Sequence, residues 1–166
     1  MLCAVEAGQP AFFGGFMFSG TPVDYQDAVL ANNGFWPDLN LRDFQEQRTI
    51  PADINAGTVA QALLTAAGEV NAELVSIEQR HKNNGYGMAS AVPGVSLDGE
   101  NLLCAQYKKA VFARAKADLI GEFATIGRRE SHPGQEGGET RKGLLAEAAM
   151  VIRSVKGLKR ATVKMV

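Results

Sequence analysis

The sequence has few of the residues on which small metal sites and disulfide frameworks depend. Its 166 residues include only two cysteines and two histidines, which excludes a disulfide framework and any Cys₄ or Cys₂His₂ zinc module. It also lacks the P-loop, the dinucleotide-binding glycine pattern and the G-x-S-x-G nucleophile motif. No run of about 18 apolar residues occurs, so we expect no transmembrane helix. These absences predict a protein that is not an enzyme and that uses no cofactor and no metal.

One cysteine and one Glu-x-x-His pair have chemically reactive side chains, and the sequence favours a structural role for both. Cys104 lies among leucines near the start of a predicted helix, so we expect a small core residue rather than a reactive thiolate. Glu78 and His81 form a lone Glu-x-x-His pair. A di-iron bundle needs a second such motif and further carboxylates, so we interpret them as ordinary residues near a helix end.

Charge is distributed unevenly along the chain. Residues 1–100 contain 4 Lys and Arg against 12 Asp and Glu, whereas residues 101–166 contain 13 against 6. The halves therefore carry opposite net charge, although the whole chain carries only −1. If the halves form different flanks, copies of the protein can associate flank to flank, which gives a ring when the rotation closes. Alternatively, the two sets of charges neutralise each other within one helical bundle.

The apolar periodicity predicts an all-α body of three main helices preceded by one short helix. We expect Asn40 to cap the short helix, which stops before Pro51. The first long helix is expected to start with the capping-box pair Thr58 and Gln61. It ends at the Asn-Asn-Gly sequence of residues 83–85.

The other two long helices are predicted from similar end signals. Asp98 is expected to cap the second, which extends to Gly127 and is nearly 40 Å long at ~1.5 Å per residue. The third is expected over about residues 139–155 and closes at Gly157. No strand is expected between Thr58 and Gly157.

The two ends of the chain differ from this helical body. No Lys or Arg precedes Arg42, and glycines interrupt the apolar run near the N-terminus, so we expect an extended arm rather than a signal peptide. These differences divide the chain into an N-terminal arm (1–34), a helical domain (35–157) and a C-terminal tail (158–166).

The C-terminal tail alternates polar and apolar residues and contains Thr and Val, which favours a strand. A strand without a partner is unstable in water, so the tail is either a frayed terminus or adds to a sheet edge in another molecule. Its residues are Lys159, Arg160, Ala161, Thr162, Val163, Lys164, Met165 and Val166.

Several sequence strings occur in an order that resembles a known family. They are FWPDL (35–39), a segment from Gln61 ending in NAEL (71–74), VPG (92–94) with LDGE (97–100), and YKKAV (107–111). Their order and spacing resemble the head completion protein (gpL) family of temperate contractile-tailed bacteriophages, over roughly residues 35–166. Residues 1–34 depart from the family pattern.

The resemblance implies a structural virion protein of the head–tail connector type. Such proteins form a homo-oligomeric ring, commonly a dodecamer, beneath the portal protein after DNA packaging. They retain the packaged double-stranded DNA and offer a surface to tail-side neck or terminator proteins. The implied location is the virion neck, with assembly in the host cytoplasm and no membrane partner. In related connectors a C-terminal extension docks onto the portal, which favours strand addition by residues 159–166.

These expectations assign two further groups of candidate site residues. The loops expected to face the channel or a neighbouring ring contain Gly85, Tyr86, Gly87, Arg128, Arg129 and His132. Packing between subunits is assigned to the long helices, through Leu63, Val70, Leu74, Tyr107 and Phe123. A small helical DNA-binding or regulatory protein that uses the basic second half is the alternative.

Overall fold

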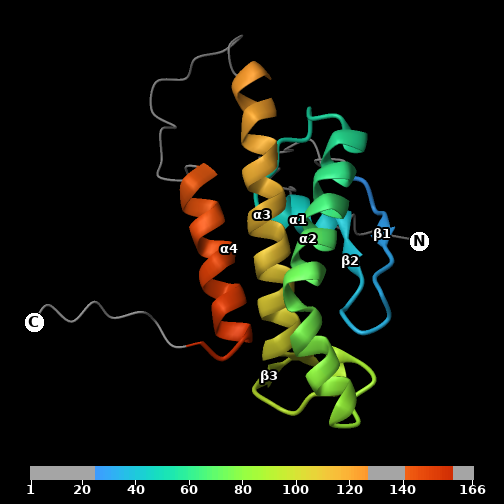
Figure 1. Ribbon diagram of the computed structural model, residues 1–166. Coiled ribbons are helices and arrows are strands. Elements are labelled where there is room, and N and C mark those ends of the chain that lie inside the picture. Colours follow the sequence, from blue (N-terminus) through green and yellow to red (C-terminus); the bar gives the residue numbers. More distant parts are fainter. Residues whose placement is uncertain (1–24, 127–140, 159–166) are drawn as a thin grey trace, which may run out of the picture.

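Four α-helices and two small hairpins make up the part of the chain that the structure describes (Figure 1). The structure is a computed structural model that describes residues 25–126 and 141–158, with the backbone alone over 121–126. The helices are α1 (Leu41–Gln47), α2 (Ala56–Asn83), α3 (Leu102–Ile126) and α4 (Arg141–Val155). Antiparallel pairs join β1 (Val29–Leu30) to β2 (Leu39–Asn40) and β3 (Ser96–Leu97) to β4 (Glu100–Asn101), and a 3-10 turn, η1, spans Ala89–Ala91. The body is mostly helical, as predicted, with strands that were not.

Helix α3 lies at the centre of the bundle. It packs against α2 on one side and α4 on the other, while α2 and α4 touch each other little (Figure 1). Four successive side chains of α3, residues 110–113, are buried. Because successive helical residues point about 100° apart, this burial requires neighbours on every side. The sequence predicts a buried stripe on α3 at Leu103, Tyr107, Ala110, Ala113, Ala117, Ile120 and Phe123, which leaves out the buried Val111 and Phe112.

Helix α2 contributes one continuous apolar face to the core. The helical period of the sequence predicts a buried stripe at Val59, Leu63, Val70, Leu74 and Ile77, and all five are buried, together with two alanines between them. Alanine favours the helical backbone and lets neighbouring helices approach closely.

The N-terminus of α2 is where the sequence-based prediction was wrong. The cap is Asn55, whose Oδ1 accepts hydrogen bonds from the backbone N–H groups of Gly57 (2.8 Å) and Thr58 (3.3 Å). Thr58 lies inside the helix and is not its cap. The far end is as predicted, since α2 stops at Asn83 and Gly85 has a positive φ of 90°.

The segment before α1 packs across α2 and α3. Asn40 caps α1, as predicted, through a 2.8 Å hydrogen bond from the N–H of Arg42. Trp36 stacks on Tyr107 with ring centroids 4.7 Å apart, and Phe35 meets Trp36 edge to face. Phe35 and Trp36 are both buried, so they attach the segment to the helical body.

A closed ring of hydrogen bonds connects this segment to both long helices. The Tyr107 hydroxyl donates to Oδ1 of Asn71 (2.8 Å), and Nδ2 of Asn71 donates to Oδ1 of Asn32 (2.9 Å). Asn32 completes the ring by donating from Nδ2 to the Tyr107 hydroxyl at 2.8 Å. Residues just before position 35 thus contact the helical body directly.

We expect Tyr107→Phe to lower the free energy of unfolding by about 1–2 kcal/mol, because Asn71 Oδ1 loses its hydrogen-bond donor and Asn32 Nδ2 loses one of its two acceptors. Burial raises the pKa of Tyr107 from 10.0 to about 12. Between these two pH values the unfolded chain loses the phenolic proton and the folded chain keeps it, so stability falls as pH rises.

Chemical denaturation at pH 7 and across pH 10–12 measures both effects. In Tyr107→Phe, the free energy of unfolding should fall less between pH 10 and 12, because the phenol that titrates there is absent. Tyr86→Phe is the matched control, because the described residues offer its hydroxyl no hydrogen bond. Equal stability of Tyr107→Phe and wild type would show that the hydrogen-bonded ring contributes nothing.

Helix α4 ends as its sequence predicts. Gly157 has a positive φ of 72°, its N–H bonds to the carbonyl of Ser154, and the N–H of Leu158 bonds to that of Arg153. Leu144, Ala148 and Ile152 are buried on the face of α4 toward the bundle, and Leu158 is the last described residue. Among the described helices, none combines the length and apolar character that a membrane span requires.

Candidate docking surface

Exposed apolar side chains gather at the end of the bundle where α3 begins and α4 stops. Three hollows lie next to one another on this surface, because each shares lining residues with the next. We call this row of hollows the basal groove, defined by Val95, Leu97, Leu102, Ala105, Met150 and Leu158. The largest exposed fractions are those of Val95 and Leu97, both 77%. Apolar side chains gathered in one patch are typical of a surface that another polypeptide covers.

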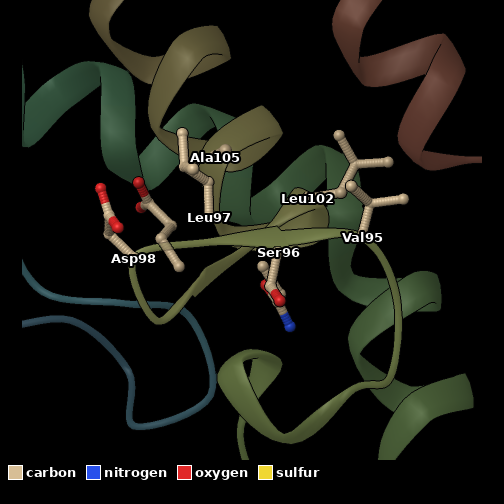
Figure 2. A pocket seen from close by; sticks show the side chains of 8 residues that line it. Val95, Ser96, Leu97, Asp98, Leu102 and Ala105 are labelled. Carbon is tan, nitrogen blue, oxygen red and sulfur yellow. The ribbon is translucent and has the colours of Figure 1, made fainter.

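The β3–β4 hairpin holds two of these side chains in place (Figure 2). Asp98 and Gly99 form its turn with positive φ values of 50° and 84°, as the Asp-Gly sequence of a two-residue hairpin favours. The N–H of Leu102 also bonds to the carbonyl of Val95 at 2.8 Å. Figure 2 shows Val95 beside Leu102, with Leu97 directed toward Ala105. The hollow here has a volume of about 390 Å³.

This hairpin corrects two sequence-based predictions. Asp98 is a turn residue and not the cap of α3, and a strand pair does occur between Thr58 and Gly157. Asn101 takes the capping role, because its Oδ1 accepts a hydrogen bond from the N–H of Cys104 at 2.9 Å. The Asp-Gly pair was the signal that could have revealed the hairpin.

Asn101 also fixes the loop that leads into the hairpin. Its Nδ2 donates to the carbonyls of Ala89 (2.7 Å) and Val92 (2.8 Å) and lies 3.3 Å from that of Ser90. The side chain is buried, so these bonds form away from bulk water. One residue thus joins the start of α3 to η1.

Helix α4 forms the other wall of the basal groove. Met150 is 54% exposed and Leu158 is 53% exposed, and both line the hollow at the end of the helix. The groove leads from there past Ala105 to the hairpin. The C-terminal tail follows Leu158 in the sequence, so it starts at one end of the groove.

Charged side chains line the groove's edge in ion pairs. Lys108 Nζ lies 2.7 Å from Glu100 Oε1, and Arg48 Nη2 lies 3.0 Å from Glu147 Oε1. Lys109 Nζ is 3.8 Å from the same carboxylate of Glu147. An apolar centre with a polar rim is the anatomy of a protein–protein interface.

Cys104, His81 and Glu78 each lie against other residues of the bundle. Cys104 is buried, and this burial raises the pKa of its thiol. Burial also lowers the pKa of His81, whose ring stacks on Phe35 with centroids 6.3 Å apart. Glu78 pairs with Lys82 at 2.7 Å. Among the described residues there is no group of three or more potential metal ligands.

Four of the side chains assigned to packing between subunits lie in the core of the subunit and not on its surface. Leu63, Val70, Leu74 and Tyr107 are all buried inside the subunit. They are therefore not exposed to a neighbouring subunit, because periodic apolar residues fill the core of their own bundle first. Phe123 belongs to α3, and its side chain lies outside the described residues.

Only the first of the two candidate loops lies within the described residues. Residues 85–87 lie at the basal end with the hairpin, where Tyr86 contacts His81 with ring centroids 6.2 Å apart. The second loop follows Ile126, at the opposite end of α3 (Figure 1). Its candidates Arg128, Arg129 and His132 lie outside the described residues, as do residues 159–166.

Ion pairs within the subunit connect the two oppositely charged halves of the sequence. Arg114 of α3 reaches Glu69 (3.3 Å) and Glu73 (2.7 Å) of α2. Lys108 of the second half likewise pairs with Glu100 of the first at 2.7 Å. These contacts favour the second of the two interpretations of the charge pattern, in which the halves neutralise each other within one bundle.

Comparison with known proteins places this architecture in a sequence family. Residues 30–166 match the family described as "Phage head completion protein (GPL)". A protein of Haemophilus phage HP1 (strain HP1c1), named "Probable head completion/stabilization protein", is 40% identical over 147 residues, covering 89% of this chain and 98% of the relative. The "Head completion/stabilization protein" of Escherichia phage P2 is 27% identical over 111 residues, covering 64% and 66%. No solved structure matches the chain.

Proposed function

This chain belongs to the phage head completion protein (GPL) family, and on that premise we propose that it closes the DNA-filled head as a ring beneath the portal. We propose a dodecameric ring. The ring retains the packaged double-stranded DNA and carries the surface to which tail-side neck or terminator proteins attach. The finished virion neck is its place of action, after assembly in the host cytoplasm.

The basal groove is the observation that carries this proposal for the chain's own residues. A protein that completes a head must bind other virion proteins, and the groove gives this chain an apolar surface with a polar rim. Its rigid frame is the hairpin fixed by Asn101. We assign the groove to contact with other head–tail proteins and the C-terminal tail, residues 159–166, to strand addition on the portal.

The alternative, a small DNA-binding or regulatory protein, has weaker support. Lys108, Lys109 and Arg114, three of the four cations of α3, each lie within 4.0 Å of a carboxylate of their own chain. Binding to phosphates would have to break these pairs. A neutralised surface also suits a channel through which DNA passes without sticking.

DNA-filled heads made without this chain test the proposed function. We expect the DNA in such heads to be digested by added nuclease, because the portal channel is open. Purified chain added before the nuclease should protect the DNA and allow purified tails to attach. Nuclease protection is measured as the length and amount of DNA recovered.

A chain that stops at Leu158 is the matched control, since it keeps every described residue and lacks the tail. We expect it to give no protection. If the full chain also gives none while it binds free duplex DNA at physiological salt, the DNA-binding alternative replaces the connector.

A further inference from the structure

The basal groove begins where the C-terminal tail begins. Leu158, the last described residue, lines the first hollow together with Met150. That hollow shares Met150 with the next, which in turn shares Leu102 and Ala105 with the hollow at the hairpin. The three hollows therefore form a row with apolar side chains in each, and one end of the row lies at Leu158, where the tail begins.

The length and pattern of the tail fit this path. Residues 159–166 can extend over about 26 Å at ~3.3 Å per residue. Alternation places Ala161, Val163 and Met165 on one face and cationic side chains on the other. The apolar face suits Leu102, Leu97 and the other exposed groove side chains.

Charge is complementary at the hairpin end alone. Asp98 and Glu100 line the hollow there, whereas Arg153 and Lys109 line the other two. The carboxylates therefore suit Lys164, near the far end of the tail. Because the tail follows directly on Leu158, which lines the groove, its effective concentration at the groove is high.

We propose that, in the free subunit, the tail lies in the basal groove of its own chain. This inference rests on the proposed function in one respect, because the tail that covers the groove is the segment assigned to the portal. The groove and the portal then compete for residues 159–166. Docking on the portal uncovers the groove, so the groove's partner binds after the portal does.

Paramagnetic labelling of the full chain tests this contact. A nitroxide is attached at Val166→Cys in a Cys3→Ser background, where Cys104 is buried and does not react. Methyl signals of Val95, Leu97 and Leu102 are recorded with the label oxidised and reduced. We expect these signals to disappear in the oxidised state and to return on reduction.

Mixing distinguishes the subunit's own tail from a neighbour's. Isotope-labelled chain without nitroxide is combined with nitroxide-labelled chain without isotope. The signals should stay at full intensity in this mixture. Loss of groove signals in the mixture would mean that a neighbour's tail fills the groove. Unchanged signals in every sample would mean that no tail does. Either result overturns the inference.

A pair of exposed substitutions provides the structural control. Leu97→Lys, at a side chain 77% exposed, should abolish the broadening because it places a cation where the apolar face of a basic tail would lie. Leu64→Lys, at a side chain 61% exposed on α2, should leave the broadening unchanged. Equal broadening in both variants would contradict binding in the groove.

Added portal protein separates this inference from the proposed function. Recovery of the groove signals on adding portal supports both. Broadening that persists in the presence of portal supports the groove contact and rejects docking of the tail on the portal. Absence of broadening in a chain whose tail is still needed for portal binding rejects the groove contact alone.

Discussion

Removal of residues 159–166 should abolish co-purification with the portal and leave the helical body as stable as before. Strand addition gains its affinity from main-chain hydrogen bonds and from pockets for alternate side chains, and both are lost with the segment. The described core consists of side chains before residue 159. The amount of portal retained on the tagged chain and the thermal melting temperature are the two measurements.

Substitutions on one face of the tail sharpen this prediction. Val163→Asp with Met165→Asp places charge on the apolar face and should reduce retention of the portal at least tenfold. Thr162→Asp with Lys164→Asp introduces the same side chains on the opposite face and should reduce retention much less. Portal bound equally well by the truncated chain and the full chain would reject the docking role.

Asn101→Asp should lower the free energy of unfolding by about 2–4 kcal/mol, although aspartate is a good helix cap. The substitution keeps the oxygen that accepts from the N–H of Cys104. It replaces the donor that serves the carbonyls of Ala89 and Val92 with a second oxygen. A buried carboxylate would then lie against carbonyl oxygens with no hydrogen-bond donor between them, and the oxygens would repel one another.

Asn55 offers the matched control for this position. It caps α2 from an exposed site and makes hydrogen bonds only of the capping kind in the described structure. Asn55→Asp should therefore be nearly neutral, and Asn55→Ala should cost about 1 kcal/mol. Urea denaturation measures all of these variants. If Asn101→Asp is as stable as wild type, the loop is not held through this side chain.

The sequence predicted α2 and α4 well because each has a single buried face. Their apolar residues recur with the helical period, and Gly85 and Gly157 mark the helix ends. Prediction of α3 was less complete, since a central helix is buried on several sides and its periodicity weakens. Its start was misplaced because Asp98 can serve either as a helix cap or as a turn residue, and the Gly99 that follows selects the turn.

The candidate site was harder to predict than the fold. The groove joins Val95 and Leu97 of a hairpin to Leu102 of α3 and Met150 of α4, and no local pattern links positions so far apart in the sequence. Conversely, the residues chosen for subunit packing, such as Leu74, were apolar residues that recur with the helical period. That property selects a core position rather than an exposed one.

The ring on the portal is tested most directly by electron cryomicroscopy of purified portal mixed with this chain. The account predicts a closed ring of this chain seated beneath the portal, with density for residues 159–166 running as a strand along a portal sheet edge. A bare portal beside unbound chain would contradict the ring. A seated ring whose tails lie on their own subunits would contradict the mode of attachment.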